Sequence, residues 1–341
     1  IRITRSHEIA SIGLLERENA AILNASLYDI ARDTAEGFKS ALDQAGVNQA
    51  MMYFCQNDGT LMSLDYAMKF PILTIACGPT NSIRGASFLS GSRDAIVLDV
   101  GGTTSDLGFV QNGFPRESSL AVEIGGVRTN FRMPDIVSIG LGGGSIVREL
   151  DGHIRVGPDS VGYRIAEKAL VFGGDTLTAT DIAVRLGLAD IGDKSKVEHI
   201  DLAFAKRAHS VMMNMINDST DRMKISKDPV PLIIVGGGSV LVGDEIDGVS
   251  EIVRPVNFGV ANAVGAAVAK VGGQVDEVYS FEQLPREQAI EQAKEAAAQH
   301  AIKAGADPDS IEIVEVDLIP LAYMGNAARI RVKATGNLLN R

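Results

Sequence analysis

Three glycine-rich stretches, each placed directly after a run of apolar residues, constrain this sequence more than any other feature. "DVGGTTSD" follows "AIVL", "GLGGGSI" follows "DIVSI", and "VGGGSV" follows "PLII". Short apolar runs of this kind are typical of buried strands. Fixing a glycine costs more conformational entropy than fixing any other residue, so glycines gathered at strand ends need a specific reason. Each apolar run is therefore predicted to be a strand that ends in a tightly packed or functional loop.

The composition is that of an acidic globular protein. The chain has 341 residues, 36 of them glycine, and a net charge of −11. No apolar run reaches the length of about 18 residues that a membrane span needs, and no basic stretch suits nucleic acid or an anionic membrane. We therefore expect neither a membrane nor a nucleic-acid partner. Cys55 and Cys77 lie in apolar segments without metal-ligand spacing, which favours buried thiols and a cytoplasmic location.

The periodicity of the apolar residues predicts a mixed α/β protein. Residues 1–50 are expected to be mostly helical, and "PILTIA" (71–76) is expected to be a strand. "AIVLDV" and "LGFVQNG" are predicted to form a hairpin across the glycine turn, and "VPLIIV" is predicted to be a buried strand. A helix rich in Ala, Gln and Glu, followed by two amphipathic strands, is expected to form a small appended unit from about residue 275.

Glycine loops at strand ends suit phosphate groups. Without a Cβ in the way, consecutive backbone N–H groups can form a concavity for an anion. Thr103, Thr104 and Ser105 add hydroxyl donors to the first loop. Asp99 and Asp106 flank that loop; carboxylates repel phosphate, so beside it they hold Mg²⁺ or position a nucleophile. As alternatives, Asp99 caps the turn and Asp106 only accepts bonds from backbone N–H groups.

Other polar residues have simpler structural interpretations. Asp175, Thr178 and Asp181 open a predicted helix, which favours N-capping, with a metal or nucleotide role as the alternative. Asn57 and Asp58 lie in a predicted turn and are expected to serve that turn.

The order of these motifs resembles the hydantoinase/oxoprolinase family, the ATP-dependent cyclic-amide hydrolases of the N-methylhydantoinase A type, within the actin/hexokinase/sugar-kinase superfamily. The resemblance covers nearly the whole chain and rests on "SHEIASIGLLERENAAILNASL", "CGPTNSIRGA", "DVGGTTSD", "SIGLGGGSI", "RVGPDSVG" and "GGDTLTATDIAVRLG". It implies an actin-like (ribonuclease H-like) ATPase fold with a mixed sheet, flanking helices and a small C-terminal helix-and-strand unit. The expected segments are 1–90, a mostly helical remainder of the first half and linker; 91–274, the second nucleotide-binding half; and 275–341, the small α+β appendage.

The resemblance also implies site residues. Asp99 and Asp106 are the expected catalytic residues, and Asp99 is the expected ligand of Mg²⁺ or Mn²⁺. Residues 101–105 would cradle the β- and γ-phosphates of ATP, and 236–239 would pass beneath its adenosine. Residues 142–145 would border the substrate or the phosphates, or form only a tight turn. The expected ATP-binding residues are Gly101, Gly102, Thr103, Thr104, Ser105, Gly142, Gly143, Gly144, Gly236, Gly237, Gly238 and Ser239.

The sequence departs from the family pattern in two places. Family members carry two Asp-x-Gly-Gly-Thr hairpins and this sequence has one, so we expect these residues to lack the first nucleotide-binding half. "YRIAEKALVF" (163–172) replaces a loop that commonly contains Pro and Cys, which puts the family's substrate and chemistry in doubt here.

The resemblance implies an enzyme subunit that phosphorylates a small cyclic amide or related carbonyl with ATP, such as a hydantoin, a lactam, 5-oxoproline or a ketone. A hydantoinase B-like partner subunit and a homo-oligomer are expected. With one hairpin, this chain alone is expected to turn ATP over very little. Two alternatives stay open: a phosphotransferase similar to sugar or acetate kinases, and a non-catalytic ATP-binding assembly protein.

Overall fold

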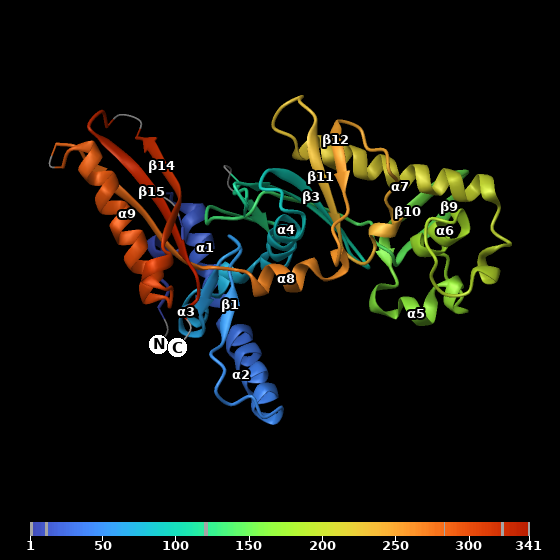
Figure 1. Cartoon of the computed structure of the whole chain (residues 1–341), viewed down its shortest axis with the longest axis horizontal. Helices are drawn as coiled ribbons and strands as arrows, with labels where there is room; N and C mark the ends of the chain where they lie inside the picture. The colour runs from blue at the N-terminus through green and yellow to red at the C-terminus, as the bar shows by residue number, and fades with distance from the viewer. Residues whose placement is uncertain (1–2, 11–12, 119–121, 283, 322–323, 340–341) are drawn as a thin grey trace. The chain divides into compact units, whose positions relative to one another are not determined.

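Two compact units make up the chain in the computed structural model (Figure 1). Unit 1 comprises Ile1–Cys77, Ser118–Met133 and Ala269–Arg341, and unit 2 comprises Gly78–Glu117 and Pro134–Val268. The structure describes residues 3–10, 13–118, 122–282, 284–321 and 324–339. All three glycine loops belong to unit 2, so the fold of unit 2 positions them.

Unit 2 is built on a mixed six-stranded sheet. Its strand order is β12-β11-β3-β4-β5, and β8 also pairs with β4. β11 runs parallel to β3 and β12, whereas β4 runs antiparallel to β3, β5 and β8, which confirms the predicted hairpin. The strands of unit 2, including the separate pair β9–β10, are β3 (Ala95–Val100), β4 (Ser105–Gln111), β5 (Phe114–Pro115), β8 (Ile136–Ile139), β9 (Ser145–Leu150), β10 (His153–Ser160), β11 (Val230–Val235) and β12 (Val249–Val253).

Helices cover both faces of this sheet, which explains why its central strands are apolar at almost every position. Alternate residues such as Leu98 and Ile234 belong to the core that includes α6 (Ala179–Leu186) and α7 (Leu202–Met223). The residues between them, such as Val97 and Val235, face α4 (Cys77–Ser90) and α8 (Ala261–Ala267). A short helix, α5 (Ile165–Lys168), precedes α6.

Helices α4 and α8 approach each other backbone to backbone. A Cβ added to Gly85 of α4 would lie 1.8 Å from the carbonyl oxygen of Ala261, and one added to Gly265 of α8 would lie 1.8 Å from that of Asn81. Because neither backbone carbonyl can move without shifting its helix, both glycines are required by packing. This close crossing fixes α4 over the sheet face that carries Asp99.

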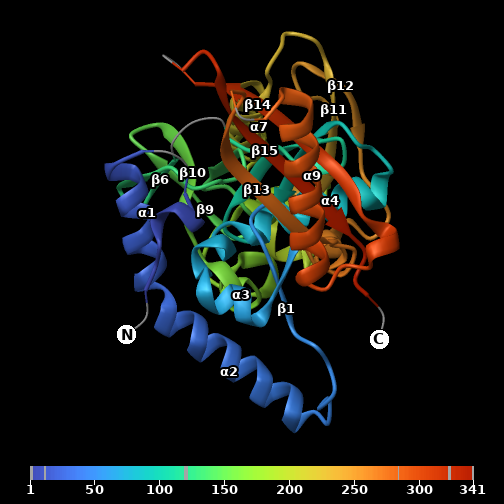
Figure 2. The same ribbon diagram turned by 90° about the vertical axis from the view of Figure 1, so that its left-hand side faces the viewer.

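Unit 1 contains a five-stranded sheet of order β1-β2-β13-β15-β14, with α9 (Arg286–Lys303) along β13 and β15 (Figure 2). Ala289, Ala293, Ala297 and Ala301 follow at intervals of four residues and are fully buried. They let the backbone of α9 approach Gly273, where an added Cβ would lie 2.2 Å from the Ala301 nitrogen. The strands of unit 1, including the separate pair β6–β7, are β1 (Tyr53–Cys55), β2 (Leu61–Ser63), β6 (Val122–Ile124), β7 (Val127–Thr129), β13 (Val271–Ser280), β14 (Glu312–Pro320) and β15 (Ala327–Gly336).

The N-terminal part of unit 1 is helical as predicted, with α1 (Leu15–Ser26), α2 (Tyr28–Gln44) and α3 (Leu64–Lys69). The strand predicted at "PILTIA" is wrong, because Pro71–Thr74 forms a 3₁₀ helix. Pro71 has no N–H for a strand ladder, and the Ile72 N–H donates instead to the Asn24 side chain at 3.2 Å. No helix among the described residues is both long and apolar enough to span a bilayer.

A buried ion pair in unit 1 joins the turn between β1 and β2 to strand β15. The Lys333 ammonium lies 2.9 Å from the Asp58 carboxylate, and both side chains are less than 5% exposed. Asp58 also accepts hydrogen bonds from the Thr60 hydroxyl and the Gln274 amide, both at 2.6 Å. Burial alone would raise the pKa of Asp58, but Lys333 and Thr60 outweigh it and lower that pKa. The turn interpretation of Asp58 therefore captures only part of its role.

We expect Gly85→Ala to destabilise unit 2 by about 3 kcal/mol, since its Cβ would overlap the Ala261 carbonyl. Gly78→Ala in the same helix is the matched control. Nothing lies within 4 Å of that position, so its Cβ should be neutral or stabilise the helix by about 0.5–1 kcal/mol. Urea unfolding measures both changes. Equal midpoints for the two variants would show that α4 and α8 do not touch at Gly85.

Lys333→Met should cost about 3–5 kcal/mol at pH 7, because it leaves the Asp58 carboxylate buried without its counter-ion. The lowered pKa of Asp58 means that the pair stabilises the native fold above about pH 4 and loses this contribution as pH falls through the folded-state pKa. The difference in free energy of unfolding between wild type and Lys333→Met should therefore become smaller in acid.

The control is Lys270→Met, which removes a more exposed partner of Glu312 at 2.7 Å and should cost about 1 kcal/mol or less. Urea unfolding at pH 7 and at lower pH measures both variants. If the stability lost in Lys333→Met is the same at both pH values, the charge on Asp58 does not stabilise the fold.

Candidate functional site

The three glycine loops meet at one end of the unit 2 sheet. The Gly143 N–H donates to the Gly101 carbonyl at 3.0 Å, and the Gly144 N–H donates to the Gly102 carbonyl at 2.7 Å. From the third loop, the Gly238 N–H donates to the Val100 carbonyl at 2.8 Å. The second and third loops are therefore both hydrogen-bonded to the first, as expected if the three serve one site.

Four of the loop glycines are explained by this contact between loops. A Cβ on Gly142 would lie 2.6 Å from the Gly102 carbonyl carbon, and one on Gly238 would lie 2.6 Å from the Gly101 oxygen. A Cβ on Gly144 would lie 2.9 Å from the Gly102 oxygen. Gly236, with φ +89°, would meet an Asp99 carboxylate oxygen at 2.3 Å.

Two other glycines have no such explanation. Nothing lies within 4 Å of a Cβ added to Gly102 or Gly237, neither has a left-handed φ, and both are exposed. Thr103 and Thr104 beside Gly102 are exposed too. Within the described part of the chain, the N–H groups of Gly102, Thr103, Thr104 and Gly237 donate no hydrogen bond. The loops thus present unused donors on an open surface, while their neighbours' donors are used internally.

Other predicted contact residues point into the protein. The Ser105 side chain is fully buried and its hydroxyl donates to the Leu141 carbonyl at 2.6 Å. Gly142, Gly143, Gly144, Gly238 and Ser239 are likewise buried. In this structure these residues support the exposed donors. Ser145, which the sequence placed with the second glycine loop, accepts from the Gly142 N–H at 2.8 Å. Sequence reasoning missed Ser160, whose hydroxyl donates to the Gly102 carbonyl at 3.3 Å.

Asp99 and Asp106 stand directly opposite each other on β3 and β4, so their side chains share one face of the sheet. Ser138 of β8, opposite Asp106, donates a hydrogen bond to its carboxylate. Burial raises the pKa of Asp99; a hydrogen bond with Ser82 of α4 opposes this, and the nearby Asp106 adds to it. None of these influences on Asp99 is a cation.

These carboxylates suit a magnesium ion that is held mainly by other ligands. Mg²⁺ commonly uses one or two carboxylates and completes its shell with water and phosphate oxygens. Asp99 and Asp106 provide such a pair next to the free N–H groups. Across the residues that the structure describes, no three His, Cys, Asp or Glu side chains gather to hold a metal, so a cage made of protein ligands alone does not fit.

The remaining candidates have structural roles. Thr178 and Asp181 form a reciprocal capping box at the start of α6, and Asp181 also accepts from the Val171 N–H at 2.7 Å, which confirms the N-cap interpretation. Asp175 is exposed and hydrogen-bonds to Thr176. Cys55 and Cys77 are half-buried.

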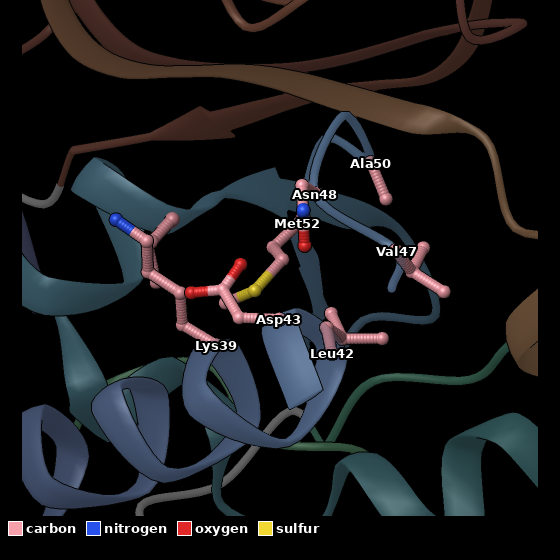
Figure 3. Close-up of a pocket in the computed structure, with 8 residues that line it drawn as sticks. Lys39, Leu42, Asp43, Val47, Asn48, Ala50 and Met52 are labelled. Carbon is pink, nitrogen blue, oxygen red and sulfur yellow. The ribbon is translucent and has the colours of Figure 1, made fainter. Parts of the chain in front are cut away.

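A shallow pocket also lies in unit 1 and contains no predicted site residue. Figure 3 shows its lining on the last turns of α2 and the loop that follows. The side chains there mix apolar groups with Lys39 and Asp43 and form no catalytic constellation.

The hydantoinase/oxoprolinase family profile matches residues 17–190, just over half of the chain. The chain therefore belongs to the hydantoinase/oxoprolinase family. Over 179 residues it is 28% identical to the acetone carboxylase beta subunit of Xanthobacter autotrophicus, covering 50% of this chain and 24% of that one. Over 207 residues it is 26% identical to 5-oxoprolinase 1 of Arabidopsis thaliana, covering 58% of this chain and 16% of that one.

Two solved structures share the fold over nearly the whole chain. The ATP-dependent caprolactamase of Pseudomonas jessenii superposes with a TM-score of 0.71 at 19% identity, over 99% of this chain and 60% of that one. A nucleotide-free acetone carboxylase superposes with a TM-score of 0.68 at 16% identity, over 98% of this chain and 59% of that one. The predicted actin-like α/β fold is thus confirmed. The chain spans about a quarter or less of the two sequence relatives and about three fifths of the solved chains.

Asp99→Asn should raise the free energy of unfolding at pH 7. Burial and Asp106 raise the folded-state pKa of Asp99, so its ionisation opposes folding above that pKa; the penalty vanishes below the unfolded pKa of about 4. Asn keeps the size and an oxygen for Ser82. The stabilisation should therefore fade as pH falls, and urea unfolding at pH 7 and pH 4 measures it.

Asp193→Asn is the matched control with the opposite sign. Asp193 caps a turn, and hydrogen bonds from Ser195 lower its pKa, so its charge favours folding. This variant should lose stability at pH 7. If Asp99→Asn loses stability in the same way, Asp99 is a turn cap and not an uncompensated carboxylate.

Proposed function

We propose that the surface formed by Gly102, Thr103, Thr104 and Gly237 binds ATP. The observation that carries this proposal is the set of four exposed N–H groups without partners, at the junction of three loops whose other donors are used. Gly102 to Thr104 would hold the β- and γ-phosphates through these N–H groups and two hydroxyls. Gly237 would leave room for the nucleoside. The ATP dependence of both solved relatives supports this assignment.

We assign Asp99, through water or directly, to a magnesium ion that neutralises phosphate charge when bound. The raised pKa of Asp99 and its nearness to Asp106 describe a pair of carboxylates that a cation would relieve. Asp106, hydrogen-bonded by Ser138, would position the water or the attacking group at the same edge. In phosphoryl transfer the protein supplies mainly positioning and charge neutralisation, and this donor set is suited to both.

The proposed reaction is ATP-dependent activation of the carbonyl oxygen of a small cyclic amide. Transfer of the γ-phosphate to that oxygen would release ADP and open the carbon to attack by water. The tetrahedral adduct would then break its C–N bond and expel the ring nitrogen, and hydrolysis of the resulting acyl phosphate would release phosphate and the open-chain product. Caprolactamase and 5-oxoprolinase among the relatives support a cyclic amide. ATP-dependent carboxylation of a ketone is the second candidate, favoured by the acetone carboxylase beta subunit and the acetophenone carboxylase gamma subunit. Bicarbonate-dependent turnover would separate the two.

A partner subunit is part of the proposal. Two of the relatives are named as subunits, and this chain spans about a quarter of each. We therefore propose that the active form contains a hydantoinase B-like subunit and more than one copy of this chain. Loss of Asp99 should lower turnover in that assembly by roughly 10²–10³, as for other preorganised electrostatic contacts.

Gly237→Val and Gly102→Val should each weaken Mg·ATP binding at least about tenfold while leaving the fold intact, because their side chains meet no protein atom and would occupy the ligand's space. Gly37→Val of α2, equally free of neighbours but far along the sequence from the loops, should bind as wild type does. Calorimetric titration of the isolated protein with its subunits measures all three. Unchanged affinity in both loop variants would remove this surface from the nucleotide site.

A further inference from the structure

Tyr163 is the most exposed of the large apolar and aromatic side chains that the structure describes, with 95% of its surface open. A single exposed aromatic residue is common on protein surfaces and needs no explanation by itself. The position of Tyr163 is less ordinary, because it lies in the short 3₁₀ helix Gly162–Arg164 directly after β10, and this segment touches the first glycine loop.

The segment before Tyr163 is fixed to two of the glycine loops. The Ser160 hydroxyl donates to the Gly102 carbonyl at 3.3 Å and accepts from the Gly162 N–H at 3.0 Å. The Val161 N–H donates to the Gly144 carbonyl at 2.9 Å. Tyr163 therefore projects from a backbone anchored to the first and second loops. An anchored, exposed aromatic ring offers contact area to a ligand at little cost in conformational entropy.

The anchoring places the Tyr163 segment beside the first two of the free N–H groups, those of Gly102 and Thr103. Gly162, with φ +56°, stands beside Thr103: a Cβ there would lie 3.7 Å from the Thr103 hydroxyl oxygen. The third loop contacts the residues just before them, where Gly238 bonds to Val100 and would meet Gly101 if it carried a Cβ. Along the first loop, the third loop thus contacts Val100 and Gly101, and the Tyr163 segment contacts Gly102 and Thr103.

In phosphoryl transfer the leaving and attacking oxygens lie roughly in line through the transferred phosphorus. If the third loop holds the nucleoside and the free donors hold the phosphates, the acceptor lies beyond the phosphates, on the side of Thr103 and Gly162. We infer that Tyr163 contacts the phosphoryl acceptor, and that its ring stacks on the planar face of a carbonyl compound. This inference rests on the proposed nucleotide site and adds the residue that selects the acceptor.

The test compares Tyr163→Ala and Tyr163→Phe with Phe88→Ala, which removes an aromatic side chain that is 63% exposed elsewhere in unit 2. Each variant is prepared as the purified protein together with its partner subunits. Mg·ATP affinity is measured by calorimetry. Acceptor binding is measured by ligand-observed NMR in the presence of Mg and a non-hydrolysable ATP analogue, with 5-oxoproline, caprolactam and acetophenone as probes, and the KM of any probe that is turned over follows.

We expect Tyr163→Ala to weaken binding of the best probe, and to raise its KM, about tenfold. Its Mg·ATP affinity should stay within twofold of wild type. Tyr163→Phe, which keeps the ring, and Phe88→Ala should both behave as wild type does. An equal loss in Tyr163→Phe would contradict stacking and point to the hydroxyl instead.

The inference and the proposed function fail in different ways. If wild type does not bind Mg·ATP, the proposed nucleotide site is wrong, and the acceptor assignment falls with it. If wild type binds Mg·ATP and Tyr163→Ala weakens that binding tenfold, Tyr163 belongs to the nucleotide site and the acceptor assignment alone is overturned. If Mg·ATP binds but no probe does, or if Tyr163→Ala leaves probe binding unchanged, the acceptor assignment is likewise overturned.

Discussion

The candidate site depends on the way the carbonyl groups of the first glycine loop are used. Val100, Gly101 and Gly102 each give a carbonyl to an N–H of a neighbouring loop. Once these carbonyls are bonded inward, the peptide groups of the loop are held with their N–H groups outward. Three consecutive donors, from Gly102 to Thr104, are then left on the surface without a partner in the described chain. A fold that only needed a tight hairpin turn would have no use for two further loops to hold it.

The two carboxylates beside these donors, like the donors themselves, are not explained by the needs of folding. The register of β3 and β4 places Asp99 and Asp106 opposite each other, at the end of a sheet face that is otherwise apolar. Burial and like charge raise the pKa of Asp99, so the folded protein carries an ionised group that its surroundings do not favour. The ion pair of Lys333 and Asp58 is the contrast within the same chain, because there burial is compensated and the pKa of the acid falls. Perturbed carboxylates without compensation are typical of functional sites.

Much of the fold, and the glycine loops that form the candidate site, could be predicted from the sequence. The apolar runs that end in glycines gave the strands and the loops, because strands buried on both faces are apolar throughout. The sequence could not separate the packed glycines from the open ones: Gly237 and Gly238 are neighbours, yet only Gly238 lies against Val100 and Gly101. Ser105 likewise follows two exposed threonines in sequence but turns inward to Leu141. Pairs such as Asp58 and Lys333, 275 residues apart, are invisible to local patterns.

The three glycine motifs look alike in sequence, but their glycines have different roles. Substitutions at these glycines must therefore be interpreted differently. Gly142 and Gly144 lie beneath the first loop, where any side chain would push Gly102 and its unused donor out of place. A loss of activity on substitution of Gly142 or Gly144 would therefore indicate a change in the shape of the first loop. Gly102 and Gly237 border open space, so a side chain there can act only on what occupies that space. The segment 163–172 adds a third kind of position: it is tied to the loops through Ser160 and Val161, and it is also where the sequence leaves the family pattern. In the proposed site, buried glycines hold the donors and this anchored segment borders the acceptor, so a change in the segment would alter the acceptor without disturbing the nucleotide.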